Sequence, residues 1–172
     1  HVQTEGFLNG MVTLGKGGTL YGSGQVGGVS NFGGLVSPGN SPGTLSIGDG
    51  GFTDVGGTLV IEFGLSGFDR LLVEGPVNLD GTLIDFRFIE GFAPDEDFEF
   101  DFVESLDQVL SLNNLRYSIT GLAPGFEFSV AEGSDGRLNF RALNAGVSAV
   151  PEAGTFALVA AGLLGLVLVR RR

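Results

Sequence analysis

The sequence contains no cysteine and no tryptophan, and its only histidine is residue 1. Without cysteine there can be no disulfide bond, no thiol catalysis and no cysteine-ligated zinc or iron–sulfur site. With His1 alone, neither a Ser-His-Asp triad nor a metal site of several histidines is expected. Proline is scarce, at 6 of 172 residues, and the 31 glycines follow no three-residue period, which excludes collagen. We therefore expect no catalytic residue, no metal site and no cofactor.

Positive charge is also scarce. The chain has 9 basic and 20 acidic residues, and three of the basic ones are Arg170, Arg171 and Arg172 at the very end. The preceding part is strongly acidic, which disfavours electrostatic binding to nucleic acid or to anionic lipid. The length is that of one ordinary domain.

Short apolar runs bounded by Gly, Asn, Ser or Asp predict strands through the first 90 residues. They lie at Met11–Leu14, Thr19–Tyr21, Thr44–Ile47, Thr58–Phe63, Arg70–Glu74 and Thr82–Ile89. A glycine-threonine-leucine motif recurs with spacings of 25, 14 and 24 residues, beginning at Gly18, Gly43, Gly57 and Gly81. We interpret each motif as a tight turn that starts a strand, and two of the spacings match one turn of a solenoid.

The second half of the body has different patterns. Residues 97–102 alternate strictly between acidic residues and phenylalanine, which predicts a strand with one apolar face. Ser105–Leu112 is the best candidate for a short helix. Residues 115–142 predict an antiparallel meander with strands Leu115–Thr120, Phe126–Ala131 and Arg137–Leu143.

The acidic run is the strongest charge feature, and it consists of Asp95, Glu96, Asp97, Glu99 and Asp101. It could form a Ca²⁺ site or supply catalytic carboxylates, but the solvated face of an amphipathic strand is the favoured interpretation. With no tryptophan and only Tyr21 and Tyr117, the chain offers little aromatic surface for stacking sugars.

Three glycine motifs are expected by chance in so glycine-rich a chain. Gly10 to Lys16 matches a Walker A loop until Gly17 replaces the hydroxyl residue, and Gly22, Gly24 and Gly27 match a dinucleotide fingerprint. No helix pattern follows either one to hold a phosphate. Residues 50–54 partly match the calcium-binding nonapeptide repeat, but only once.

A long apolar segment lies near the C-terminus. Residues 153–169 carry no charge, Glu152 precedes them and three arginines follow. A helix of this length would span about 25 Å, against about 30 Å for the hydrocarbon core. We expect one transmembrane helix with its arginines on the cytoplasmic side. A buried helix in a soluble domain is the alternative.

This tail resembles the PEP-CTERM sorting signal of exported proteins in Gram-negative bacteria. The matching residues are Val150, Pro151, Glu152 and Ala153, followed by the apolar segment and by Arg170, Arg171 and Arg172; Ala153 stands where the family has a second proline. The resemblance implies that an exosortase-type enzyme in the inner membrane reads the motif. The arginines would stop translocation, and the protein would be anchored transiently before reaching the cell surface or the medium.

The body resembles the autotransporter-associated β-strand repeat. The resemblance rests on the proline- and glycine-rich turn of residues 36–47 and on residues 68–75 and 79–83. It implies a right-handed parallel β-helix and carries no shared catalytic residues.

Together these features predict an all-β protein: the C-terminal end of a right-handed parallel β-helix, capped by antiparallel strands, with one C-terminal transmembrane helix. We expect an extracytoplasmic domain over residues 1–143, a linker over 144–150 and the sorting signal over 151–172. The expected function is that of a non-enzymatic surface or extracellular-matrix protein, structural or adhesin-like, with exopolysaccharide as a further candidate partner. The alternatives are the end of a β-helix polysaccharide hydrolase or lyase, and a Ca²⁺-stabilised adhesin.

Overall fold

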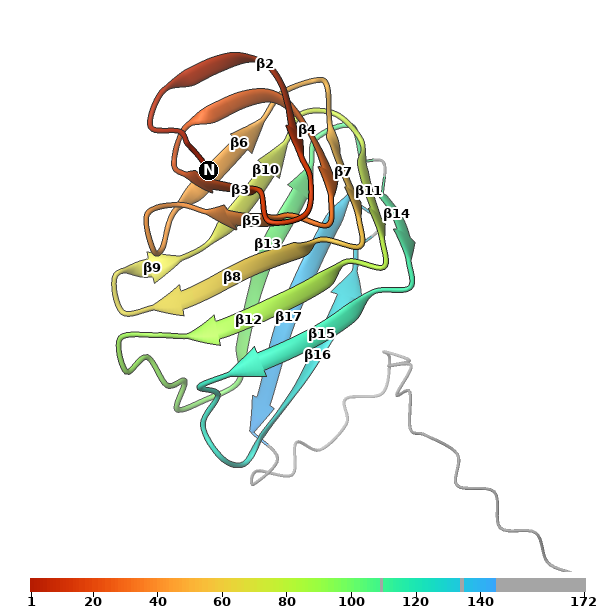
Figure 1. The fold of residues 1–172 in the computed structure, drawn as a ribbon. Helices are drawn as coiled ribbons and strands as arrows, with labels where there is room; N and C mark the ends of the chain where they lie inside the picture. Colours follow the sequence, from red (N-terminus) through yellow and green to blue (C-terminus); the bar gives the residue numbers. More distant parts are fainter. Residues whose placement is uncertain (109, 134, 145–172) are drawn as a thin grey trace, which may run out of the picture.

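Two β-sheets make up the computed structural model, which describes residues 1–108, 110–133 and 135–144 (Figure 1). Over these residues there are strands and turns and no helix. Sheet A contains β1 (Val2–Gln3), β3 (Thr19–Gly22), β5 (Leu35–Pro38), β8 (Thr58–Gly64), β9 (Gly67–Phe68), β12 (Leu83–Phe88) and β15 (Arg116–Thr120). Sheet B contains β2 (Phe7–Leu14), β4 (Gln25–Phe32), β6 (Thr44–Ile47), β7 (Phe52–Val55), β10 (Arg70–Val73), β11 (Val77–Asp80), β13 (Phe98–Ser105), β14 (Leu110–Asn113), β16 (Phe126–Glu132) and β17 (Arg137–Asn144).

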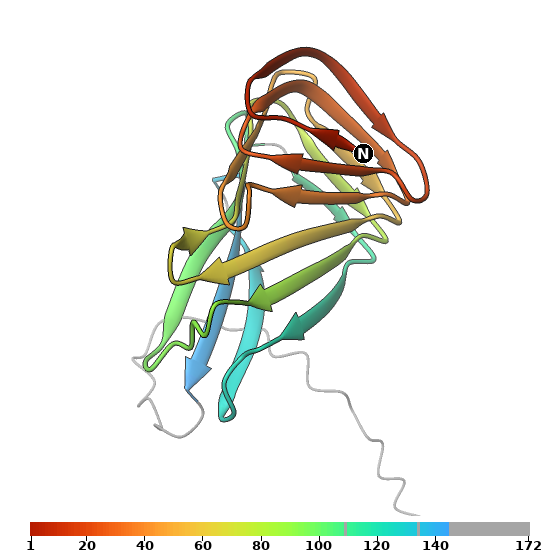
Figure 2. The same cartoon turned by 60° about the vertical axis from the view of Figure 1, so that its left-hand side comes forward.

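The chain passes repeatedly from one sheet to the other, and each pass lies beside the one before it. In sheet A the order β1-β3-β5-β8-β12-β15 follows the sequence, and all of these neighbours are parallel (Figure 2). Sheet B has two arms, because β4 pairs with β6 through its first residues and with β7 through its last. From there β6-β10-β13 form one arm and β7-β11-β14 the other, again in parallel.

Glycine makes the bend between the two arms possible. A side-chain carbon on Gly50 would lie 2.7 Å from the carbonyl oxygen of Gly27 in the preceding pass, and one on Gly75 would collide with the carbonyl of Asp49. Backbone therefore rests directly on backbone at this corner, and only a residue without a Cβ fits there.

The core consists of apolar side chains that lie above one another in register. In sheet A, Leu20, Val36, Leu59 and Ile84 are register partners from strand to strand, and all are fully buried. Each such burial stabilises the fold by about 1.5–3 kcal/mol relative to exposure. The alternating burial along β3, β10 and β12 is the two-residue period predicted from the sequence.

Phenylalanine dominates the core in the C-terminal half, where Phe63, Phe86, Phe102 and Phe140 are all fully buried. The strands of sheet B lengthen from 4 residues in β6 and β10 to 8 in β13 and β17. Rings from both sheets meet there, with Phe140 of β17 placed 4.6 Å from Phe86 and 5.0 Å from Phe63 between centroids. Edge-to-face and tilted pairs predominate, the arrangements that the ring quadrupole favours.

Apart from the short pairing of β9 with β8, antiparallel strands are found at the end of the body. β17 is antiparallel to β13 on one side and to β16 on the other. The predicted all-β class is confirmed, as is the presence of parallel pairing with antiparallel strands beyond it; the β-helix itself stays a prediction.

Two predictions for this region are wrong. Ser105–Leu112 is not a helix: β13 runs through Ser105, and β14 then pairs in parallel with β11. The N–H of Leu106 donates to Val73 O, and Gln108 has a φ of 60°, so strand pairing overrides local helix propensity. The meander over 115–142 is also incomplete, because β15 joins sheet A in parallel with β12, and only β16 and β17 form an antiparallel hairpin.

The apolar segment 153–169 lies outside the described residues, as does the expected linker apart from its first residue, Asn144, which is instead the last residue of β17. Among the residues that are described, no helix is long and apolar enough to cross a membrane.

Candidate functional site

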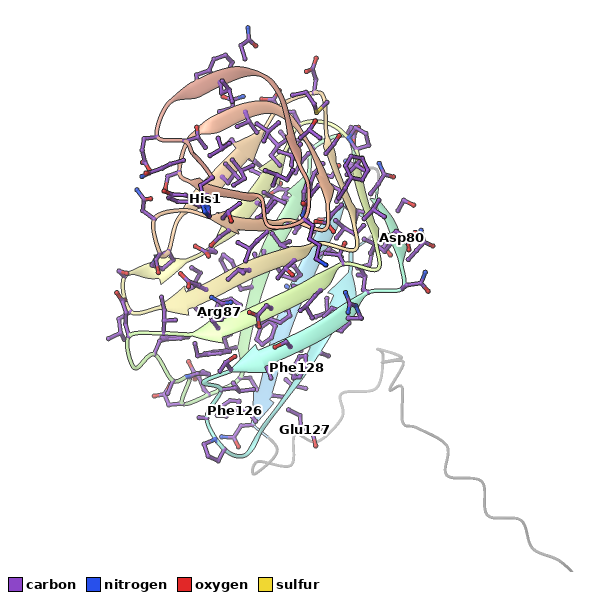
Figure 3. The ribbon with its side chains drawn as sticks, viewed as in Figure 1. His1, Asp80, Arg87, Phe126, Glu127 and Phe128 are labelled. Carbon is purple, nitrogen blue, oxygen red and sulfur yellow. The ribbon has the colours of Figure 1, made fainter. Side chains whose placement is uncertain are left out.

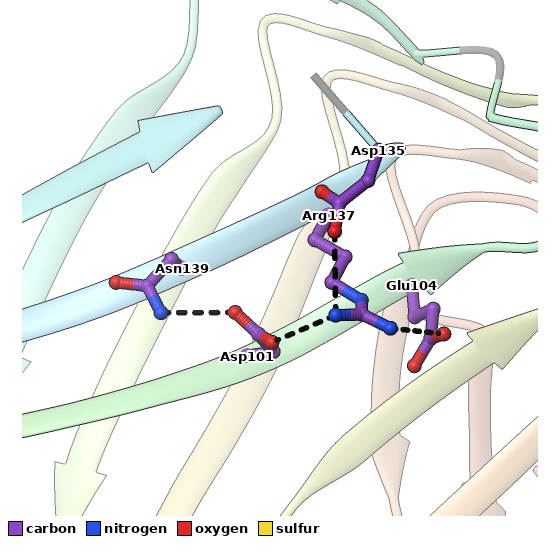
Figure 4. Close-up of polar contacts among 5 residues, drawn as sticks. All are labelled: Asp101, Glu104, Asp135, Arg137 and Asn139. Atoms are coloured by element: carbon purple, nitrogen blue, oxygen red, sulfur yellow. Dashed lines mark hydrogen bonds and ion pairs between the residues drawn. The ribbon is translucent and has the colours of Figure 1, made fainter. Parts of the chain in front are cut away.

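The acidic run lies on β13 and in the turn before it, and three of its side chains contact β17: Asp97, Glu99 and Asp101, the last of which is drawn in Figure 4. Glu99 forms an ion pair of 2.9 Å with Arg141, and Asp101 accepts a hydrogen bond of 2.9 Å from the side-chain amide of Asn139. Asp97 accepts a 3.0 Å hydrogen bond from the backbone N–H of Asn144. These carboxylates are thus cross-strand partners rather than a converging ligand set.

Arg137 lies near two further carboxylates and near Asp101, at the other end of the same strand pair. Its guanidinium lies 3.0 Å from Glu104, 3.3 Å from Asp135 and 3.8 Å from Asp101. The hydrogen bond from Arg137 to Glu104 and the surrounding negative charge raise the pKa of the guanidinium. Over the described ranges no three His, Cys, Asp or Glu side chains are grouped so that they could hold a metal ion. This arrangement favours the interpretation of the acidic run as the solvated face of an amphipathic strand over its interpretation as a Ca²⁺ site.

The opposite face of β13 bears out the predicted alternation. Phe98 and Phe100 are half-buried and Phe102 is buried in the ring cluster. A bulge between Asp101 and Val103 shifts the register, so Phe102 and Val103 are both buried.

The three glycine motifs lie in strands and in the turns that connect them. Gly10 to Lys16 runs from β2 into the next turn, and Gly22 to Gly27 connects β3 with β4, so strands follow both. Asp54, which ends the partial nonapeptide match, is fully buried and lines no open site.

Asp54 instead organises a buried polar network that links three passes. It accepts hydrogen bonds from Asn31 Nδ2 at 2.5 Å, from Thr82 Oγ1 at 2.6 Å and from the N–H of Gly57 at 2.9 Å. Sequence reasoning missed this network. The sequence pattern that could have indicated the network is an Asn or Asp, then any one residue, then two glycines. This pattern occurs at Asn31 and again 23 residues later at Asp54.

An open hollow of about 450 Å³ lies on the outer face of sheet A, and no sequence pattern predicts it. It is lined by Thr19 and Tyr21 of β3, Leu35 and Ser37 of β5, Gly39, Asn40 and Ser41 of the following turn, and Glu62 of β8. The hydroxyl of Ser41 donates a hydrogen bond to the Glu62 carboxylate. Five of the eight lining residues carry uncharged polar side chains.

Asp69 joins the backbone of Glu62, which lines the hollow, to Gly43, which follows the turn that carries Asn40 and Ser41. One carboxylate oxygen accepts from the N–H of Gly43 at 2.7 Å and the other from the N–H of Glu62 at 3.0 Å. Burial raises the pKa of Asp69 to about 7, against the two N–H bonds, which lower it. Because Asp69 is fully buried, it positions the walls and does not reach solvent.

A family model of the PEP-CTERM protein-sorting motif matches residues 149–172. The match covers Val150, Pro151, Glu152 and Ala153 and the three terminal arginines, which all lie outside the described residues; it assigns no role to any one of them. Searches of curated proteins and of solved structures gave no match. The chain therefore carries a C-terminal sorting motif that supports an exported, exosortase-sorted protein and passage through the membrane.

Proposed function

We propose that this chain is a non-enzymatic surface or extracellular-matrix protein, with a β-sheet body delivered by its C-terminal signal. The sorting motif at residues 149–172 is the observation that carries the proposal. Val150 to Ala153 would be read by the processing enzyme, the apolar segment would hold the chain in the inner membrane, and the arginines would stop its translocation. The processed body would then remain on the cell surface or enter the matrix, where exopolysaccharide is its candidate partner.

We further propose that the body is the end of a parallel β-solenoid. The parallel pairing of each pass with the next supports this architecture, as does the register stacking of Leu20, Val36, Leu59 and Ile84. In such a fold each pass contacts only its neighbours, and an extended regular surface results. That surface suits a structural or adhesive role.

The C-terminus of the exported protein tests the sorting proposal. Mass spectrometry of material recovered outside the cell is expected to find a terminus near residues 150–153. Mature extracellular protein that still ends at Arg172 would contradict the proposal.

Replacing Arg170, Arg171 and Arg172 by serine tests the anchor. Without the basic cluster, retention in the inner membrane or the orientation of the chain is expected to change. Replacing Arg137, which lies in the body, by serine is the matched control and should leave membrane retention intact. A triple variant in which both retention and orientation are unchanged would argue against an anchor.

A further inference from the structure

We propose that the hollow on sheet A binds a neutral, hydroxyl-rich saccharide unit. This inference rests on the proposed function only for the source of the ligand, a polysaccharide of the surrounding matrix. The hollow itself is a feature of the described body, far along the chain from the sorting motif.

Hydrogen-bonding capacity in the hollow matches sugar hydroxyls. Tyr21 donates its hydroxyl hydrogen to Gln3 at 3.1 Å, and Asn40 donates from its amide to Glu5 at 2.6 Å. The tyrosine oxygen and the carbonyl oxygen of Asn40 are therefore left as acceptors, beside the Glu62 carboxylate. Hydroxyls of Thr19 and Ser37 add groups that both donate and accept. A ligand that presents several O–H donors satisfies this set.

Charge narrows the ligand class further. The lining includes Glu62 and contains no lysine or arginine, and Glu5 lies next to Asn40. An anionic sugar such as a uronate would meet negative charge and no cation to pair with. The ring of Tyr21 and the side chain of Leu35 supply the apolar patch on which the C–H face of a neutral sugar can lie.

The walls of the hollow are held in place before any ligand binds. Gly39 and Gly22 exchange two backbone hydrogen bonds of 2.9 and 3.0 Å, which fix the turn that carries Asn40 and Ser41. Asp69 ties the end of this turn at Gly43 to the backbone of Glu62. Little conformational entropy remains to be lost on binding, which favours recognition by a shallow site.

Binding can be measured on the full chain, held in a detergent without a sugar headgroup, by calorimetry and by saturation-transfer NMR. The probes are maltohexaose and cellohexaose as neutral oligosaccharides, and a hexamer of galacturonate as the anionic one. We expect saturable binding of at least one neutral hexamer and none of the uronate. Tyr21→Ala should weaken binding by about tenfold or more, because truncating a central aromatic contact removes much of the binding energy.

Tyr117→Ala is the matched control, since Tyr117 is the second tyrosine of the chain and lies on β15, outside the hollow. It should bind like the wild type. Ser37→Leu, which fills the hollow without adding charge, provides a second test if Tyr21→Ala folds poorly, and it should also weaken binding. Failure of both neutral hexamers to bind, tighter binding of the uronate, or equal losses in the Tyr21 and Tyr117 variants would overturn the proposal. None of these results would alter the C-terminus found by mass spectrometry, so the two proposals fail separately.

Discussion

Asp54 and Asp69 are both fully buried carboxylates, yet they are held in different ways. Asp54 accepts from two side chains and one backbone N–H, whereas Asp69 accepts only from two backbone N–H groups. Both residues bind segments that are distant in sequence. In a body built from parallel passes, such residues fix the position of one pass on the next.

Replacing Asp54 by alanine is expected to lower the free energy of unfolding by about 3 kcal/mol or more, because three buried donors lose their acceptor. Denaturant unfolding followed by circular dichroism measures this change. Asp80→Ala is the control: Asp80 is exposed at the end of β11 and accepts one hydrogen bond from Asn114 (Figure 3). Its effect should stay within about 0.5 kcal/mol. Equal losses in the two variants would contradict the role given to the network.

Asp69 should make stability depend on pH. Burial raises its pKa from the ordinary value of 3.8, which applies to the unfolded chain, to about 7 in the folded protein, so the folded state holds the proton more tightly. The stability that this proton contributes is complete below about pH 4 and is lost as the pH rises through about 7. Over that window the contribution of Asp69 falls by up to about 1.4 kcal/mol per pH unit.

Unfolding measured at several pH values for the wild type and for Asp69→Asn checks this expectation. The amide cannot titrate, so the difference in stability between the two proteins should narrow as the pH rises from 4 to 7. The asparagine variant should also be less stable at low pH, because its NH₂ group would face an N–H donor. A constant difference across the window would contradict the prediction.

At the scale of elements, β17 closes the wide end of the core. It lies between β13 and β16, and Phe140 at its centre packs against rings from β8 and β12. The hydrogen bonds and ion pairs on its outer face join charges that are largely exposed, and such pairs contribute little. The aromatic face of β17 should therefore dominate its stability.

Phe140→Ala is expected to destabilise the protein by about 3–5 kcal/mol, through lost burial and the cavity left among the rings. Phe32→Ala is the matched control, since Phe32 on β4 is 54% exposed and belongs to no ring pair that the structure describes. The control should change the free energy of unfolding by less than about 0.5 kcal/mol. Thermal or denaturant unfolding distinguishes the two, and a similar loss for both would refute the assignment of the core.

At the scale of the whole molecule, the passes lengthen toward the C-terminus. Register partners in sheet A are Thr19 with Leu35, Leu35 with Thr58, Thr58 with Leu83, and Leu83 with Arg116. The steps along the chain are therefore 16, 23, 25 and 33 residues. The core widens with them, and the side chains that fill it change from valine and leucine to phenylalanine.

This progression explains how far the sequence could predict the fold. Strand positions follow from local alternation and from turn residues, and most were predicted to within a few residues. Pairing could not be predicted from a fixed repeat, because the glycine-threonine-leucine motifs occupy different places: Thr19 and Thr58 start strands of sheet A, whereas Thr44 starts β6 of sheet B. Thr82 is shifted by one residue and turns inward to Asp54.

The candidate site was less predictable than the fold. The sorting motif is contiguous in sequence, so it could be recognised from its residues alone. The hollow combines side chains of β3, β5 and β8, and these come together only once parallel pairing places the strands side by side. No sequence pattern indicates the role of Asp69, because its hydrogen-bond partners are backbone N–H groups, which nearly every residue possesses.

Truncation tests the dependence of each pass on its neighbours. Removing residues 1–17 deletes β1 and β2 and exposes one end of the stack, and the remaining strands should stay folded. A chain that ends at residue 125 lacks β16 and β17, uncovers the phenylalanine core and should not fold. Limited proteolysis and near-ultraviolet circular dichroism separate these outcomes, with a chain ending at Asn144 as the control. Loss of folding in the variant that lacks residues 1–17 would contradict the expectation that the remaining strands stay folded.

The antiparallel position of β17 has a mechanical consequence. The strand ends at Asn144, directly before the segment that leads to the sorting motif, so a pull on that segment acts along the strand axis. Because β17 is bonded to β13 on one side and to β16 on the other, both ladders are sheared at once, and many hydrogen bonds must break together. A protein tethered through its C-terminus in flowing medium would thus meet drag at the strand best placed to resist it.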